Sequence, residues 1–348
     1  MAKRIALFNH KGGVSKTTTT FNLGWMMAQK GKKVIMVDTD PQCNLTGMVL
    51  GYRGPDDFEQ LYKKQEQRNL RYGLSPAFES RPTPIKAVDC IPVRGRRGLY
   101  LLPGHIRLSE YEVTLGIAQE LSGSIQTLQN LPGAISNLLE LTAKKFDADY
   151  VLIDMNPSLS SINQNLLTTS HYFILPTTPD YFSVMAIDSL SNVLPNWYAW
   201  VKKVHSLPLL KDAAYPFPEI DPKFIGTIIQ NYRPRGKVPA KAFQKWIDEI
   251  NNRILTTFVP TLANINMLLP EEKYENQDLQ PGLCLATISD FNALIAQSQR
   301  AQAPIFALTP KQIGQSGIVL ERTVKARDRF KKIFSDLADK VIGLTTDG

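Results

Sequence analysis

IALFNHKGGVSKTT, residues 5–18, is the stretch of sequence that decides the fold. It opens with an apolar run at residues 5–8 that is typical of a buried strand, and apolar side chains in residues 19–30 recur with helical spacing. A strand, a glycine-containing loop, a lysine, a hydroxyl residue and a helix follow one another in a phosphate-binding loop. Glycine lets backbone N–H groups wrap a phosphate, and the helix N-terminus adds partial positive charge. The stretch therefore predicts a nucleotide site.

Each position of this loop has an expected role. We expect the Lys16 ammonium to neutralise the β- and γ-phosphates, and the Thr17 hydroxyl to hold Mg²⁺. The alternative is a glycine turn beside an unrelated lysine, and the flanking strand and helix argue against it. The residues expected to surround the phosphates are Lys11, Gly12, Gly13, Val14, Ser15, Lys16, Thr17 and Thr18.

The loop departs from the usual G-x-x-x-x-G-K-[ST] pattern, because His10 and Ser15 stand where that pattern has glycine. A lysine, Lys11, opens the glycine pair instead, and this resembles the deviant Walker A box of the ParA/MinD family of P-loop ATPases. The resemblance implies a homodimer that sandwiches ATP, with Lys11 reaching the ATP of the other subunit. A solvated loop lysine is the alternative. If Ser15 needs a positive φ, it costs on the order of 1 kcal/mol, which bears on hydrolysis more than on binding.

Two acidic residues follow a second apolar run at residues 34–37. The segment Asp38-Thr39-Asp40-Pro41-Gln42 resembles the D-x-D-P-Q segment of the same family. The resemblance implies that Asp40 positions the attacking water, which makes it catalytic together with Lys11 and Lys16. Asp38 is expected to serve either the Mg²⁺ shell or the structure of the loop.

A third apolar run, at residues 150–153, ends in Asp154. This is a Walker B arrangement, in which a strand delivers a carboxylate to the Mg²⁺ water shell. Asn156 replaces a proline of the family pattern, so we expect a less rigid loop there. Asn231 ends another apolar run, at the place where the family carries an Asn that contacts the base. The resemblance therefore makes Asn231 a candidate for binding adenine. Asn is also a common turn residue at strand ends.

Strands alternate with helical stretches along the 348 residues. This order predicts an α/β fold with one doubly wound, mostly parallel twisted sheet, helices on both faces and nucleotide at the carboxyl ends of the strands. We expect a single ParA-like domain over residues 1–348, with surface insertions at about 53–98 and 195–224. Three scattered cysteines, Cys43, Cys90 and Cys284, provide no cluster-ligating pair, which disfavours an iron–sulfur carrier or nitrogenase-reductase-like member.

Basic side chains gather in two places on a chain of net charge +8. A basic helix is expected at about 318–342, with Arg322, Lys325, Arg329 and Lys332 on one face. The expected core-facing side chains of that helix are Val319, Ala326, Phe330, Ile333, Leu337 and Val341. The second cluster contains Arg233, Arg235, Lys237 and Lys241. Such clusters suit the phosphates of non-specific DNA, which the ATP-bound dimers of ParA-type relatives bind; a solvated helix face is the alternative.

The resemblance implies an Mg²⁺-dependent ATPase that is slow until an adaptor, such as a ParB-like protein, stimulates it. ATP-bound dimers would hold DNA, and hydrolysis would release it, so that a plasmid, a chromosome region or a protein cargo is positioned. We expect a cytoplasmic, nucleoid-associated protein, because the start of the chain shows no signal peptide or helix-turn-helix extension. One alternative is a MinD-like membrane-associated ATPase, which the short tail at residues 341–348 disfavours. Another is a poorly hydrolysing, ATP-locked dimer or filament.

Overall fold

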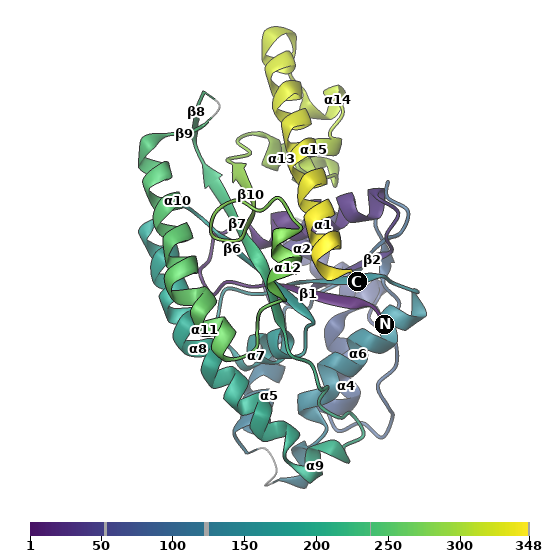
Figure 1. Cartoon of the computed structure of the whole chain (residues 1–348). Helices are drawn as coiled ribbons and strands as arrows, with labels where there is room; N and C mark the ends of the chain where they lie inside the picture. Colours follow the sequence, from purple (N-terminus) through teal and green to yellow (C-terminus); the bar gives the residue numbers. More distant parts are fainter. Residues whose placement is uncertain (52–53, 122–124, 237, 347–348) are drawn as a thin grey trace.

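A central sheet of eight strands forms the middle layer of the molecule (Figure 1). The computed structural model describes residues 1–51, 54–121, 125–236 and 238–346, and every structural statement here concerns those residues. The strand order is β10-β7-β6-β1-β5-β2-β4-β3. The strands are β1 Lys3–Leu7, β2 Val34–Asp38, β3 Ile91–Pro92, β4 Leu99–Leu102, β5 Tyr150–Asp154, β6 Tyr172–Thr177, β7 Lys223–Tyr232 and β10 Cys284–Ser289.

The pairings between neighbouring strands are parallel, except that β3 runs antiparallel to β4. β1 lies between β5 and β6, and its last residue, Leu7, is in register with Asp154. Asp38 at the end of β2 is also in register with Asp154. The carboxyl ends of β1, β2 and β5 therefore meet at one edge, which confirms the predicted fold class and places the phosphate loop beside both acids.

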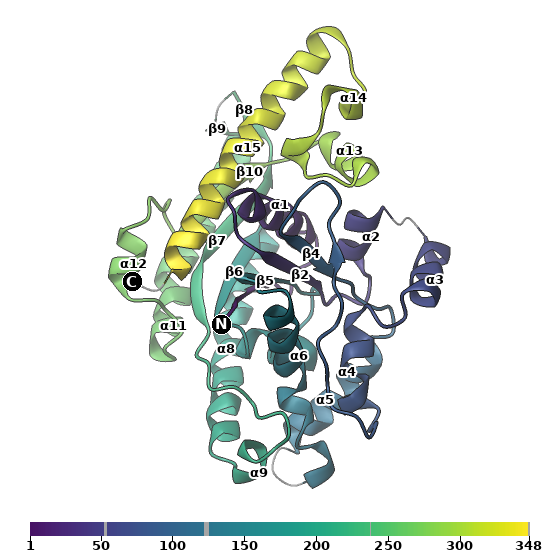
Figure 2. The same ribbon diagram turned by 90° about the vertical axis from the view of Figure 1, so that its right-hand side faces the viewer.

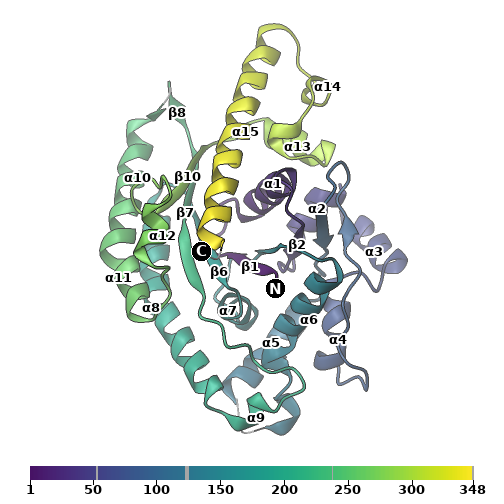
Figure 3. The ribbon, with the colours of Figure 1, turned by 45° about the vertical axis from the view of Figure 1, so that its right-hand side comes forward.

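Helices cover both faces of the sheet (Figure 3). Alternate residues of β1 enter different cores, because Ile5 and Leu7 pack on one face and Ala6 on the other. The first face carries α1 Lys16–Gln29, α2 Asn44–Leu50, α13 Leu294–Ala301 and α15 Gly317–Thr345. The second face carries α4 Leu70–Phe78, α5 Ser109–Glu120, α6 Leu131–Lys145, α7 Ser161–Thr168, α8 Tyr181–His205, α10 Lys241–Arg253 and α11 Val259–Asn264.

The two predicted surface insertions are wrong in part. The stretch at about 53–98 contains α3 Pro55–Lys64, and its later part belongs to the core: α4 and the segment up to β3 bury Leu70, Leu74, Ile85 and Val88. Residue 53 itself lies outside the described residues. In the stretch at 195–224, residues 195–205 complete α8, with Trp197 and Val201 buried. Pro195 lies inside that helix and did not mark an irregular segment, whereas Pro216, Pro218 and Pro222 do lie in a stretch without helix or strand before β7.

The long helix α15 divides into a packed half and a projecting half (Figure 1). Its later turns bury Phe334, Leu337 and Val341, whereas Val319 near its start is 57% exposed, which corrects its assignment to the core. Figure 2 shows α13 and α14 beside the projecting half. The remaining elements are the hairpin β8 Pro234–Arg235 with β9 Val238–Pro239, α9 Pro208–Lys211, α12 Glu271–Glu275, α14 Pro310–Ile313, the 3₁₀ turns Gln126–Leu128 and Ile305–Ala307, and a π-helical turn Ile254–Phe258. Among the described residues, no helix combines the length and apolar character needed to cross a bilayer.

Candidate functional site

The phosphate loop joins β1 to α1 and turns through two left-handed residues. Gly13 has φ 75° and Ser15, which precedes the first residue of α1, has φ 58°. Ser15 therefore occupies the conformation in which a serine side chain is strained, as the sequence led us to expect for a position that needs positive φ. The loop leads directly into the N-terminus of a helix of 14 residues, so the free N–H groups of the first turn lie at the loop.

Lys16 lies at the centre of this loop. Its ammonium donates to the carbonyl oxygens of Asn9 (2.7 Å) and Lys11 (3.2 Å), and the side chain is buried. Burial lowers the pKa of Lys16 to about 8, although the carboxylates of Asp154 and Asp40 raise it. A buried ammonium with acids on one side is suited to binding phosphate, because the anion supplies the charge that burial withholds.

Lys11, the lysine that opens the loop, is bound within its own chain. Its ammonium pairs with Asp180 (2.5 Å) and donates to the hydroxyls of Thr178 (2.6 Å) and Ser183 (3.1 Å). Asp180 is also the N-cap of α8, where it accepts a hydrogen bond from the backbone N–H of Ser183 (2.9 Å). The side chain of Lys11 is therefore directed toward the start of α8. These contacts argue against the alternative that Lys11 is a solvated loop lysine.

Asp154 is a buried carboxylate that lacks hydrogen-bond donors. It is 1% exposed, and neither oxygen accepts a hydrogen bond of normal geometry from the described residues. Burial raises the pKa of Asp154 well above its usual value and the neighbouring Asp38 raises it further, whereas the Thr17 hydroxyl and the Lys16 ammonium lower it. An unpaired buried carboxylate beside a hydroxyl fits a divalent cation, because the ion supplies the missing charge partner.

Asp38 and Asp40 differ in what they bind. One oxygen of Asp38 accepts from both the backbone N–H (2.8 Å) and the hydroxyl (2.6 Å) of Thr46 on α2, and burial raises the pKa of Asp38 to about 7. Of the two roles predicted for Asp38, these contacts favour the structural one. Asp40 accepts from the backbone N–H of Gln42 (2.9 Å) and lines the cavity, where burial raises its pKa.

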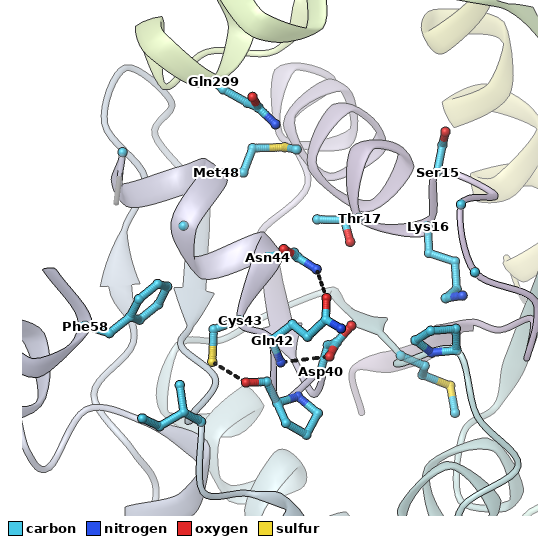
Figure 4. A pocket seen from close by; sticks show the side chains of 18 of the residues that line it. Ser15, Lys16, Thr17, Asp40, Gln42, Cys43, Asn44, Met48, Phe58 and Gln299 are labelled. Atoms are coloured by element: carbon cyan, nitrogen blue, oxygen red, sulfur yellow. Dashed lines mark hydrogen bonds between the residues drawn. The ribbon is translucent and has the colours of Figure 1, made fainter. Parts of the chain in front are cut away.

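A cavity of about 1200 Å³ opens over the phosphate loop (Figure 4). Ser15, Lys16 and Thr17 lie along one side of it, and Asp40 and Gln42 face them from the loop after β2. The far end, lined by Met48, Phe58, Ile106, Ala296, Gln299 and Arg300 from other elements, was not predicted from the sequence. The cavity is large enough for a nucleotide.

Asn231 lies at the end of β7 in a left-handed conformation, with φ 62°. Its amide donates to the hydroxyl of Ser15 (3.0 Å) and to the carbonyl oxygen of Gly13 (3.3 Å). Asn231 therefore supports the phosphate loop, and the binding of adenine by Asn231 stays a prediction. The next residue back, Gln230, was missed: it is buried and donates to the Val14 carbonyl oxygen (3.1 Å) and the Thr19 hydroxyl (2.8 Å).

Hydrogen bonds from α7 hold the loop after Asp154. Asn163 on α7 donates to the backbone and side-chain oxygens of Asn156, at 2.9 and 2.7 Å, and to the carbonyl oxygen of Ser158 (2.8 Å). We predicted a less rigid loop because Asn156 replaces a proline. These hydrogen bonds restrain Asn156, which lacks the ring of a proline, and the rigidity of the loop stays a prediction.

The two basic clusters lie at the same end of the molecule, on the projecting half of α15 and on the β8–β9 hairpin (Figure 1). Burial raises the pKa of Tyr232 at the end of β7, and the guanidinium of Arg329 is close enough to lower it. Lys237 of the second cluster lies outside the described residues. The exposed basic side chains that the structure brings to this end are Arg322, Lys325, Arg329 and Lys332 on α15, and Arg233, Arg235 and Lys241 at the hairpin.

The partners of Lys11 and Lys16 are the main site residues that sequence reasoning missed. Asn9 precedes the loop and donates to the Pro176 carbonyl oxygen (2.8 Å) while its own side-chain oxygen accepts from the backbone N–H of Lys11 (2.9 Å). Asp180 carried a local signal, because Asp is one of the residues preferred at a helix N-cap. No such signal linked it to Lys11.

The chain belongs to the ParA/MinD family of P-loop ATPases. The family described as AAA domain matches residues 2–204. The sporulation initiation inhibitor protein Soj of Bacillus subtilis (strain 168) is 31% identical over 194 residues, which cover 56% of this chain and 65% of Soj. The chain therefore matches less than two thirds of that relative's length.

Solved structures agree with this fold. The structure of pNOB8 ParA bound to nonspecific DNA aligns with a TM-score of 0.56 at 19% identity, and covers 98% of both chains. Cobyrinic acid a,c-diamide synthase from Mycobacterium smegmatis, with a bound ATP analogue and magnesium, aligns with a TM-score of 0.51 at 22% identity. That alignment covers 73% of this chain and 83% of the synthase.

Asp154→Asn tests the buried carboxylate as the cation site. Without nucleotide or metal, the variant should be more stable than the parent by about 1–3 kcal/mol, because it no longer buries an unpaired acid. ATP with Mg²⁺ should then stabilise it far less than the parent, because the cation loses its carboxylate. Chemical denaturation with and without the ligands measures both effects. Asp278→Asn, at an exposed acid, is the control, and equal stabilisation of parent and Asp154→Asn by ATP and Mg²⁺ would contradict the assignment.

Proposed function

We propose that this protein is an ATP-dependent switch ATPase that dimerises around ATP and positions a DNA or protein cargo. The observation that carries the proposal is the pair of lysines at one phosphate loop. Lys16 is buried beside Asp154 and Asp40, and Lys11 opens the same loop with its ammonium held at the start of α8. In this proposal Lys16 serves a nucleotide of its own chain, and Lys11 serves a second chain once it leaves Asp180.

The proposed chemistry is phosphoryl transfer from ATP to water. Backbone N–H groups of the phosphate loop and the Lys16 ammonium bind the phosphates, and Thr17 and Asp154 hold Mg²⁺, which neutralises charge on the phosphates when bound. Asp40 lies on the opposite side of the cavity and orients the water. Positioning and charge neutralisation provide most of the rate acceleration in such reactions. The ATP analogue and magnesium of the mycobacterial synthase support this choice of cofactors.

The contacts of Lys11 suggest how ATP would control association. In the single chain, the Lys11 ammonium is satisfied by Asp180, Thr178 and Ser183. Triphosphate of a second subunit offers more negative charge than one partly exposed carboxylate, so a dimer with ATP can draw Lys11 away from Asp180. A dimer without ATP offers no such compensation, and association therefore depends on the nucleotide.

Lys11→Ala tests this role. The variant should bind ATP with nearly unchanged affinity, because Lys16 and the backbone of the loop remain. ATP-dependent dimerisation should weaken at least about tenfold, because a charge-assisted contact across the interface is lost. Size-exclusion chromatography with light scattering, in ATP and Mg²⁺, measures the dimer. Lys211→Ala on α9 is a matched control, since that lysine is exposed far from the loop (Figure 1). Dimerisation of Lys11→Ala at parent levels would contradict the role in trans.

We further propose that ATP-bound dimers bind DNA without sequence preference. The basic side chains of α15 and of the β8–β9 hairpin are exposed at one end of the molecule and suit a phosphate backbone. The DNA-bound pNOB8 ParA, which shares the fold, supports this proposal. Dimerisation would double the basic surface, so ATP would control the affinity for DNA. A ParB-like or other adaptor would stimulate ATP hydrolysis, and the protein would then release the DNA. The protein would then act in the cytoplasm, on the nucleoid.

The double variant Lys325→Ala/Lys332→Ala should weaken binding to random-sequence duplex DNA at all salt concentrations. The plot of log affinity against log salt should become less steep by about two, because the variant makes two phosphate contacts fewer and each contact releases about one counterion. Fluorescence anisotropy with ATP and Mg²⁺ measures this slope. Lys203→Ala/Lys211→Ala carries the same charge change at the opposite end of the molecule and should behave as the parent. Identical slopes for the two double variants would refute the assignment of DNA binding to α15.

A further inference from the structure

Two residues in the left-handed backbone conformation meet where the phosphate loop touches the end of β7. Ser15 has φ 58° and Asn231 has φ 62°, and neither is glycine. The Ser15 hydroxyl lies 3.0 Å from the amide nitrogen of Asn231 and 3.3 Å from its amide oxygen. Glycine at position 15 would adopt this conformation without strain but would lack the hydroxyl. Strained residues persist where the surrounding structure holds them, and they gather at ligand clamps and switch regions.

This contact is one of several between the phosphate loop and β7. Asn231 also donates to the Gly13 carbonyl oxygen (3.3 Å). Its neighbour Gln230 is fully buried and donates to the Val14 carbonyl oxygen (3.1 Å) and the Thr19 hydroxyl (2.8 Å). Three consecutive residues of the loop are therefore bonded to two consecutive residues of the strand. A change in the conformation of the loop reaches the end of β7 without an intervening element.

The chain leaves the sheet directly after this contact and forms the basic β8–β9 hairpin (Figure 1). Arg233 follows Asn231 by two residues, and Arg235 follows it by four. Both arginines are exposed, as is Val238, so the described part of the hairpin has little packing of its own. At the base of the hairpin, the backbone N–H of Ala240 donates to the Arg233 carbonyl oxygen (3.0 Å). The end of β7 and the start of α10 therefore determine where these arginines lie.

We propose that the Ser15–Asn231 contact transmits nucleotide occupancy of the phosphate loop to the arginines of the β8–β9 hairpin. Phosphates bound by the N–H groups of the loop hold Ser15 in its left-handed conformation, and the contact then holds Asn231 and the hairpin that follows it. An ordered hairpin loses less entropy when its arginines bind phosphates of DNA. This inference rests on the proposed function and adds a control of DNA binding within one subunit, beside the control through dimerisation. It depends on this chain in particular, because Ser15 stands where the usual loop has glycine.

Hydrogen–deuterium exchange of the full chain, followed by mass spectrometry with and without ADP and Mg²⁺, tests the proposal. ADP fills the phosphate loop without the γ-phosphate that the proposed dimer needs, and light scattering measures the oligomeric state in the same samples. In the parent, saturating ADP should slow exchange at least about threefold in peptides that cover Arg233 and Arg235. Asn231→Gly should abolish this effect, because glycine keeps the left-handed conformation and removes the amide. Asn266→Gly is the matched control, since Asn266 is also left-handed (φ 56°) but is bonded to Asp221 (3.0 Å) near the start of β7.

Two variants of Ser15 separate the hydrogen bond from the backbone strain. Ser15→Ala keeps the strained conformation and loses the hydroxyl, whereas Ser15→Gly loses both. At saturating ADP, both variants should lack the slowed exchange at the hairpin. Slowed exchange that persists in Ser15→Gly would overturn the proposal, because the contact would then not be needed. The double variant Ser15→Ala/Asn231→Gly should show no further loss, since the two changes remove one contact.

Two other results would overturn the proposal: an effect of ADP in Asn231→Gly that equals the effect in the parent, and no effect in a parent that binds ADP. A fluorescent ADP analogue measures nucleotide binding in the same samples. A parent that binds no nucleotide refutes the proposed function and the transmission with it, whereas bound ADP without a change at the hairpin refutes the transmission alone. With ATP and Mg²⁺, and at an equal level of dimer, Asn231→Gly should bind random-sequence duplex DNA about fivefold more weakly than the parent. Equal affinity would contradict a role of the contact in DNA binding.

Discussion

The unpaired carboxylate of Asp154, buried beside the Lys16 ammonium, is the feature on which the site depends. Parallel pairing of β5 with both β1 and β2 brings Asp154 into register with Leu7 and Asp38, so the phosphate loop and the acids meet at one edge of the sheet. Burial raises the pKa of Asp154 and lowers that of Lys16, so burial disfavours the charged form of both groups. A phosphate and a divalent cation would satisfy both.

In the proposed function, Lys11 would connect this site to a second chain. Its ammonium is fixed by Asp180, which also caps α8, so the loop and the start of α8 form one unit.

Much of the fold and the nucleotide site was predictable, because local patterns determine them. β1, β2 and β5 are short apolar runs that end at the loop or at an acid, and such runs are recognisable in a single sequence. The partner of Lys11 was not predictable, because Asp180 lies 169 residues away and only the pairing of β1 with β6 brings it close. α4 and the end of α8 were missed because their buried residues are separated by prolines and charges, and tertiary packing overrides those signals.

The most direct test of the account is the affinity of the parent protein for random-sequence duplex DNA in three nucleotide states: none, ADP, and ATP with Mg²⁺, each across a salt series. The account predicts tight binding with ATP and Mg²⁺ alone, and a steep loss of affinity as salt rises, because phosphate contacts release counterions. Equal affinity in all three states would show that the nucleotide does not control the basic surface. Absence of binding in every state would contradict the assignment of that surface to DNA.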